Sequence, residues 1–323
     1  MDIYSYIGHD SQLCGVEQVR LIGGKGDGMR LLQIRNAAGM ECTVCADRCA
    51  DISRLIFKGD NMGYFSPCGY VSPCYYDDQG TGFLKSFTAG FLTTCGLTAV
   101  GNPCEDEGES LPMHGSIGNT PCERIWWTED EDNLYVHAGI NDGAIFTRKL
   151  YMMRTITISK WDNQLIVDDV VENRADRETP LMLMYHINIG YPLLSEHSRL
   201  EISSVGVEAE NAHAAKDLDS WAKILPPTPG FEEQCYFHRL AEEGRASVYN
   251  PHIRKGLTVS FDPKKLDHFT QWKMMGVRDY ALGLEPGNCY PSTRDAVRQQ
   301  GALQFLKPGE RSQYRFVVTL FEK

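Results

Sequence analysis

Apolar and polar residues alternate along most of this 323-residue chain, in short runs separated by polar turns. As far as residue 189, such runs lie at residues 29–34, 40–45, 51–57, 134–140, 145–159, 164–173 and 180–189. Alternation with a period of two predicts β-strands that bury one face. The connections N-D-G, K-W-D-N and N-R-A-D-R-E-T are too short for a helix and have hairpin lengths, so we expect antiparallel sheets.

The second half continues the pattern at residues 234–239, 246–250, 256–261, 268–275 and 280–285. The chain ends in Q-F-L, a K-P-G-E turn and Q-Y-R-F-V-V-T-L-F, which predict a closing hairpin. Only residues 292–300 predict a helix, with Ser292 and Asp295 at capping-box spacing. No charged or Gly/Ser-rich linker interrupts the strands, so we expect an all-β fold. It would be one large antiparallel β-sandwich over residues 1–323, with few short helices.

Residues 63–108 depart from this alternation and are rich in aromatic residues, Gly and Pro. A long non-periodic segment in a compact protein is usually functional or disordered, and this one is too aromatic to be disordered. We therefore expect it to form the wall of a cleft.

Composition and charge limit what that cleft can bind. The chain is 42% hydrophobic, enough for a substantial core, and its 32 basic against 43 acidic residues give a net charge of −11. Nucleic acids and anionic membranes require a basic surface, so neither is expected as a partner, and a neutral small molecule fits better.

The location of the protein is predicted from what its sequence does not contain. No apolar run approaches the roughly 20 residues that span a bilayer, and the first ten residues do not resemble a signal peptide. The 11 cysteines are odd in number and lie mostly in apolar strand patterns, which is unlike a disulfide framework. We expect a reduced, cytoplasmic protein; the sequence does not predict its oligomeric state.

Two further groups of residues could have a chemical role, but in each case a structural role is the preferred interpretation. Cys42, Cys45 and Cys49 are spaced closely enough to suggest a metal site, but residues three apart on a strand face opposite sides, so buried packing is preferred. The acidic run Glu105–Glu109 could supply the paired carboxylates of a glycosidase, but a solvated loop is the preferred interpretation.

Three residues have surroundings that are unusual for surface strands. His114 lies in the turn L-P-M-H-G-S, where backbone can approach a ligand closely, and His186 lies in the apolar strand M-Y-H-I-N-I-G-Y-P. Glu285 ends the apolar run of L-G-L-E-P-G-N. Each has an ordinary alternative, a hydrogen-bonded core histidine or a turn glutamate. We predict that the three meet in one pocket.

Taken together and in this order, P-M-H-G, Y-H-I-N-I-G-Y-P, L-G-L-E-P-G-N and the late L-K-P-G-E resemble the aldose 1-epimerase (galactose mutarotase-like) superfamily, closest to an uncharacterised epimerase-related branch. The resemblance spans nearly the whole chain and implies a β-supersandwich with a sugar cleft. It implies that His186 is the general acid, that Glu285 is the general base and that His114 binds sugar hydroxyls. It also matches Glu233, in E-Q-C-Y-F, to the family's sugar-binding aspartate.

The sequence departs from the family pattern in two places. The usual arginine before the H-G motif is missing, which leaves Arg48 as the nearest basic candidate for sugar binding, with a structural ion pair to Asp47 or Asp51 as its alternative. H-G-S replaces the commoner H-G-G. Trp221 and Trp272 could stack on a sugar, although core packing is the default for both. These departures affect the identity of the sugar more than the type of reaction.

The residue types suit epimerisation at the anomeric carbon. Ring opening removes the C1 hydroxyl proton and protonates the ring oxygen, and closure can present the other face. A carboxylate and an imidazole can exchange these protons, so no cofactor or metal is expected. We expect an isomerase acting on an aldose or aldose derivative. The alternatives are a carbohydrate-binding or sensing protein without turnover, and a lyase or glycosidase using Glu107 or Glu109.

Overall fold

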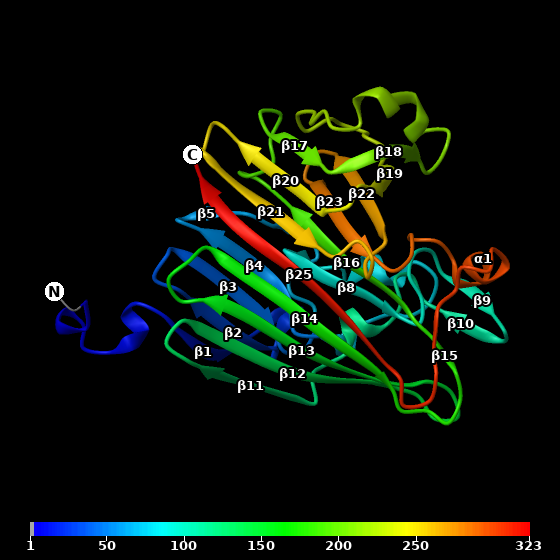
Figure 1. Cartoon of the computed structure of the whole chain (residues 1–323), viewed down its shortest axis with the longest axis horizontal. Helices are drawn as coiled ribbons and strands as arrows, with labels where there is room; N and C mark the ends of the chain where they lie inside the picture. Colours follow the sequence, from blue (N-terminus) through cyan, green and yellow to red (C-terminus); the bar gives the residue numbers. More distant parts are fainter. Residues whose placement is uncertain (1–2) are drawn as a thin grey trace.

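A computed structural model describes residues 3–323, and most of its strands belong to three large antiparallel sheets (Figure 1). The largest has eight strands in the order β11-β12-β13-β14-β25-β21-β20-β17. In chain order these strands are β11 (Arg124–Glu129), β12 (Asn133–Gly143), β13 (Lys149–Ser159), β14 (Gln164–Asn173), β17 (Arg199–Ile202), β20 (Gly244–Asn250), β21 (Lys255–Phe261) and β25 (Arg311–Glu322).

The second sheet has six strands in the order β18-β19-β22-β23-β16-β8 and carries the candidate site. Its members are β8 (Leu92–Leu97), β16 (Met182–Ile189), β18 (Ser204–Ala209), β19 (Gln234–Leu240), β22 (His268–Met275) and β23 (Tyr280–Gly287). The third is a five-stranded meander of β1 (Gly15–Arg20), β2 (Arg30–Arg35), β3 (Met40–Cys45), β4 (Asp51–Phe57) and β5 (Asp60–Asn61). The predicted all-β, antiparallel sandwich is therefore confirmed.

Short pairs of strands and single turns of helix complete the described fold. The two-stranded pairs are β6 (Tyr64–Phe65) with β7 (Ala89–Gly90), β9 (Cys104–Asp106) with β10 (Glu109–Leu111), and β15 (Thr179–Pro180) with β24 (Phe305–Leu306). The α-helix is α1 (Arg294–Gln299), beside β9 and β10 in Figure 1. The 3-10 turns are Ile3–Tyr6, Asp10–Gln12, Gly24–Gly26, Pro73–Tyr75, Gly82–Lys85, Ile117–Asn119 and Ala214–Ser220.

One continuous apolar core joins the inner faces of the three large sheets. It includes Leu55 from β4, Val167 from β14, and Tyr185 and Ile187 from β16. Because side chains alternate along a strand, burying Tyr185 and Ile187 turns the intervening His186 to the opposite face of the six-stranded sheet. The core thus decides which face of this sheet carries polar chemistry.

The structure corrects two strand connections. The segment N-R-A-D-R-E-T is not a hairpin turn, because β14 before it belongs to the eight-stranded sheet and β16 after it to the six-stranded sheet. The expected closing hairpin is also absent: β24 pairs with β15, and β25 pairs with β14 and β21. The predicted helix exists but begins at Arg294 after an N-cap Thr293, so Ser292 does not cap it.

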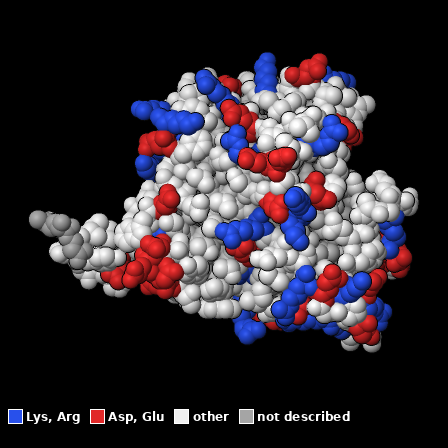
Figure 2. Space-filling view, viewed as in Figure 1, with Lys and Arg blue, Asp and Glu red and all other residues white. Residues whose placement is uncertain are grey.

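Two further properties concern the outside of the molecule. On the face shown in Figure 2, acidic and basic side chains lie in small mixed groups rather than in a continuous basic surface. In residues 3–323, no helix has the length and apolar character needed to cross a membrane. The first two residues of the segment considered as a signal peptide lie outside the described part of the chain.

Candidate active site

A cleft of about 590 Å³ opens over the polar face of the six-stranded sheet, a volume within the usual range for small-molecule sites. Part of its wall comes from residues 63–108, as predicted, including Tyr64, Phe83, Phe87 and Asn102. The other lining residues are Ser66, Pro67, Cys68, Leu84, Gly101, Met113, His114, His186, Glu210, Glu233, Cys235, Trp272, Met274, Asp279, Glu285 and Pro291. The cleft therefore brings together all three residues predicted to share a pocket.

His186 and Glu285 form the closest acid–base contact in the cleft. They lie on neighbouring strands β16 and β23, and His186 Nε2 is 3.2 Å from Glu285 Oε1. Glu285 is 3% exposed and its Oε1 accepts no aligned hydrogen bond from residues 3–323; the same is true of His186 Nδ1. A buried acceptor without a partner is costly, so this pair is built to receive polar groups from a ligand.

Gly283 explains how a carboxylate fits at this place. Gly283 lies directly across from Asn188 of β16 and from Trp272 of β22. A Cβ atom at Gly283 would overlap Glu285 Oε1 and would lie 2.8 Å from the Cβ atom of Trp272. The glycine of L-G-L-E therefore leaves the space in which the Glu285 carboxylate lies over the sheet.

The H-G loop places His114 in the cleft lining next to His186. His114 and Gly115 both have left-handed backbone conformations, and a Cβ atom at Gly115 would overlap the Gly96 carbonyl. The Gly101 N–H donates to His114 Nδ1 at 3.3 Å, so in the neutral ring the proton is on Nε2. The two histidine rings lie 5.9 Å apart and nearly perpendicular. His114 is thus placed to offer a sugar a hydrogen-bond donor beside the His186–Glu285 pair.

Burial shifts the pKa values of these three side chains in opposite directions. It lowers the pKa of His114 to about 4, and burial followed by the neighbouring His114 lowers the pKa of His186 to about 3. Burial, then the charges of Glu233 and Glu210, hold the pKa of Glu285 well above its usual value. The pKa of Glu285 therefore lies above that of His186, so the first proton that the pair takes up goes to Glu285.

Glu233 lies one residue before β19 and lines the cleft as predicted. It accepts a hydrogen bond of 2.8 Å from Trp272 Nε1, which fixes the indole against the His186 ring at a centroid distance of 5.3 Å. Trp272 is thus a wall of the cleft, whereas Trp221 packs on the core and against His238. The preferred prediction that Trp272 packs in the core is therefore wrong.

Glu210 was not singled out from the sequence, although it lines the same cleft. It follows β18, its N–H donates to the carbonyl of Cys235, and burial raises the pKa of its carboxyl. In V-E-A-E-N it has the pattern of an ordinary exposed turn carboxylate. No local signal distinguishes it, because its position in the cleft depends on strands from elsewhere in the chain.

Arg48 is not among the described residues that line the cleft. Its side chain is 4% exposed and donates to the Val71 carbonyl at 3.1 Å. The alternative ion pair is also not formed within the described chain, because Asp47 pairs with Arg30 and Asp51 with Arg154. The structure thus does not place this arginine where a sugar in the cleft would contact it.

The acidic run is an ion-pair network rather than the expected solvated loop. Asp106 is 5% exposed and binds Arg294 and Arg298, while Glu109 binds Arg148 and Arg294. These contacts connect the β9–β10 hairpin to α1. Glu107 and Glu109 do not line the cleft, so they are not placed to act there.

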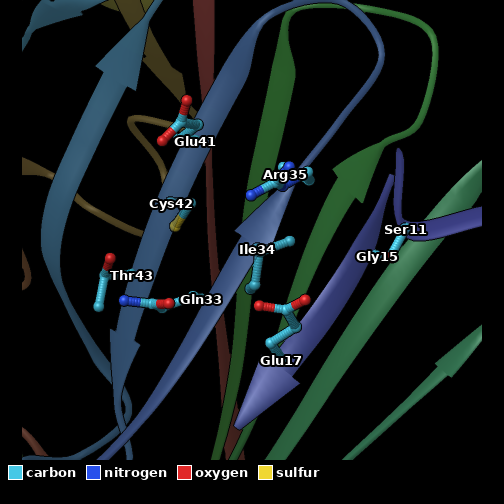
Figure 3. Close-up of a pocket in the computed structure, with 9 residues that line it drawn as sticks. All are labelled: Ser11, Gly15, Glu17, Gln33, Ile34, Arg35, Glu41, Cys42 and Thr43. Atoms are coloured by element: carbon cyan, nitrogen blue, oxygen red, sulfur yellow. The ribbon is translucent and has the colours of Figure 1, made fainter. Parts of the chain in front are cut away.

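The cysteine cluster and a second hollow carry no comparable chemistry. Cys42 packs in the main core and Cys45 in a separate small cluster, on opposite sides of β3 as predicted. In residues 3–323 no group of three or more His, Cys, Asp or Glu side chains could hold a metal ion. A hollow of about 130 Å³ on β1, β2 and β3 is lined by Glu17, Arg35 and Glu41 among others, and by no histidine (Figure 3).

Solved structures show the class of protein that this fold and cleft define. A protein of Klebsiella pneumoniae subsp. pneumoniae MGH 78578, provisionally named an aldose 1-epimerase, superimposes with a TM-score of 0.90 and 26% identity over 95% of this chain and 83% of its own. A galactose mutarotase-like protein of Clostridium acetobutylicum superimposes with a TM-score of 0.70 and 13% identity, over 97% of this chain and 100% of its own. The galactose 1-epimerase of Lactobacillus acidophilus NCFM superimposes with a TM-score of 0.65 and 15% identity, over 96% of this chain and 99% of its own.

The fold is thus that of the aldose 1-epimerase, or galactose mutarotase-like, superfamily. Within it, residues 26–320 match the model of a family described as a domain of unknown function, DUF4432, and the chain belongs to this family. That description agrees with the uncharacterised branch suggested by the motifs. No curated protein matches the sequence.

Proposed function

We propose that this protein is a cofactor-independent isomerase that interconverts the anomers of an aldose or aldose derivative. The observation that carries the proposal is the contact of 3.2 Å between His186 Nε2 and Glu285 Oε1, buried at the wall of a sugar-sized cleft. The named activities of the structural relatives support the same reaction class. The ligand is a small sugar.

The reaction requires one base and one acid. Glu285 accepts the proton of the C1 hydroxyl, the O–H electron pair forms the C1 carbonyl, and the bond from C1 to the ring oxygen breaks. The electron pair of that bond goes to the ring oxygen, which takes a proton from His186. Rotation about the bond between C1 and C2 and the reverse steps close the ring on the other face. His114 donates from Nε2 to a sugar hydroxyl and holds the ring in place.

The proton count of the pair suits this cycle. Ring opening converts a Glu285 carboxylate and a His186 imidazolium into a Glu285 carboxylic acid and a neutral imidazole, and closure reverses the change. Both forms carry one proton and no net charge. Burial favours the second form, so substrate contacts have to favour the first form before the ring opens.

Saturation-transfer NMR across a panel of aldoses tests the proposal. Turnover of at least one aldose is expected, and Glu285→Gln and His186→Asn should each lower kcat by about 10²- to 10⁴-fold. A wild-type rate in Glu285→Gln would exclude it as the base. Absence of turnover across the panel, together with measurable sugar binding, would instead support the non-catalytic carbohydrate-binding alternative.

A further inference from the structure

The cleft has an unusual charge balance. Four carboxylates line it, from Glu210, Glu233, Asp279 and Glu285, and none of the described lining residues is Lys or Arg. The two histidines add no positive charge at neutral pH, because burial lowers the pKa of His114 to about 4 and that of His186 to about 3. The described cleft therefore contains acidic groups without a basic partner.

Two of these residues, Glu210 and Glu233, are exposed, and a cation bound to them would offset the negative charge that acts on the buried Glu285. Glu285 is 3% exposed with Oε1 lacking an aligned donor, and the charges of Glu233 and Glu210 act on it. Glu233 uses one oxygen to accept from Trp272, and Glu210 accepts on Oε2 from Asn211 at 3.3 Å, contacts that supply no positive charge. Ionising a carboxyl group that is withdrawn from water, as Glu285 is, costs less when a cation lies close to it.

We propose, building on the function proposed above, that the cleft selects an aldose carrying an ammonium group, an amino sugar, over its neutral and anionic counterparts. Glu210 and Glu233 bind the ammonium. An ammonium supplies three donors to these acceptors and no competing acceptor. A phosphate or carboxylate on the sugar would face the same acidic groups and be repelled.

An ammonium in this place also helps the chemistry. A nearby positive charge favours the ionised form of a carboxyl group, so it would shift the His186–Glu285 pair toward the form that opens the ring. A neutral sugar offers hydroxyl donors but not this charge. Amino sugars should therefore gain in kcat as well as in KM.

The test compares matched sugars on the wild-type protein by saturation-transfer NMR at about pH 6.5 and low salt. One series is glucosamine, glucose, N-acetylglucosamine and glucose 6-phosphate, and the second is the galactose equivalent, so that charge is separated from stereochemistry. In the series that is turned over, we expect kcat/KM for the amino sugar to exceed that of the parent by at least about tenfold. The 6-phosphate should be the poorest substrate.

Variants identify the residues responsible. Glu210→Gln and Glu233→Gln keep the side-chain shape and should each lower the ratio of amino-sugar to parent kcat/KM by several-fold. Glu41→Gln removes the same charge from an exposed position on β3, outside the cleft, and should leave the ratio unchanged (Figure 3). Circular dichroism establishes that each variant is folded.

The failure of this inference can be told apart from failure of the proposed function. Turnover of the parent aldose with an equal or poorer rate for the amino sugar would overturn the ammonium selectivity and leave the epimerase proposal standing. If no aldose is turned over, the binding affinities of glucosamine and N-acetylglucosamine, measured by calorimetry, still test the ammonium selectivity. Tighter binding of glucosamine would support the selectivity, and equal or weaker binding would overturn it.

Discussion

At the scale of single residues, the site depends on which face of a strand each side chain occupies. His186 lies between the core residues Tyr185 and Ile187, and Glu285 follows the core residue Leu284. Strict alternation therefore turns both toward the cleft, where burial changes their protonation. The same packing that stabilises the sheet creates an acid–base pair in which the pKa of Glu285 is raised and that of His186 is lowered.

The pH dependence of the reaction follows from these shifts. We expect kcat/KM not to fall as the pH is lowered from 7 to about 5, in contrast to a site whose histidine takes up a proton near pH 6.5. Burial lowers the pKa of His186 to about 3, so the pair gains a second proton only as the pH falls toward that value. The pair loses its last proton only as the pH rises through the raised pKa of Glu285.

Anomer exchange measured by polarimetry from pH 4 to pH 9 checks this expectation, with circular dichroism at each pH as the control for unfolding. A fall in kcat/KM centred near pH 6.5 in folded protein would show that His186 titrates as an exposed histidine does. That outcome would contradict the lowered pKa of the buried His186.

Gly283 gives a second prediction at this scale. In Gly283→Ala the new Cβ atom would occupy the space of the Glu285 carboxylate, while the backbone at this position suits any residue. We expect kcat to fall by about 10²-fold, since small displacements of a catalytic group are that costly. Anomer exchange measures the change, and an unchanged kcat would show that the carboxylate can move without loss.

The matched control is Gly8→Ala, where a Cβ atom would meet only Gln12, at 3.7 Å. It changes the same atoms far from the cleft lining and should leave kcat unaltered. Thermal unfolding of both variants distinguishes a displaced carboxylate from a damaged sheet.

At the scale of elements, the residue ranges of the strands were predicted far better than the pairing of one strand with another. Residues 40–45 and 268–275 coincide with β3 and β22, because alternation is a local property of the sequence. The crossing after β14 and the pairing of β24 with β15 were mispredicted, because nothing local states which distant strand lies alongside. Strand β8 was missed altogether, since both its faces are buried and its residues do not alternate.

The candidate site divides in the same way. His114, His186, Glu233 and Glu285 were found because they lie in short motifs. Glu210 was not, because it reaches the cleft only through long-range packing, and Phe83 and Phe87 were predicted only as part of the segment 63–108. Arg48 was proposed from its charge and position in sequence, and packing placed it outside the cleft lining.

The β9–β10 hairpin gives a prediction for an element. Arg148 donates to Asp142 at 2.9 Å, to Glu109 at 3.2 Å and to Ser116 of the H-G loop at 3.3 Å. This brace holds the loop that carries His114, so Arg148→Met should raise KM for the sugar several-fold and change kcat less. Ser116→Ala removes only the link to the loop and should shift KM in the same direction by a smaller factor.

Arg177→Met is the control for the brace, because Arg177 is exposed and pairs only with the adjacent Asp176 within the described chain. It should leave both constants unchanged. Steady-state anomer exchange separates KM from kcat. A loss of kcat at constant KM in Arg148→Met would mean that the brace acts on proton transfer and not on His114.

At the scale of the whole molecule, one buried ion network joins the three large sheets. Arg154 of β13 is 0% exposed and binds Asp169 of β14 through two nitrogens and Asp51 of β4 at 2.7 Å. Arg154 also donates to Thr94 of β8, and the Tyr185 hydroxyl donates to Asp169. Tyr185 and Thr94 face each other across β16 and β8, next to the His186 position, so the network anchors the strand behind the site.

Removing Arg154 should therefore cost stability across the whole fold. In Arg154→Met, Asp169 and Asp51 lose their cation while still buried, and breaking one partner of a buried ion pair costs about 3–5 kcal/mol. Urea unfolding measures the loss. Arg315→Met is the control: Arg315 pairs with Asp168 at 3.6 Å on the exposed face of the same sheet, where such pairs contribute about 0–1 kcal/mol. Equal losses in the two variants would show that the buried network does not hold the sheets together.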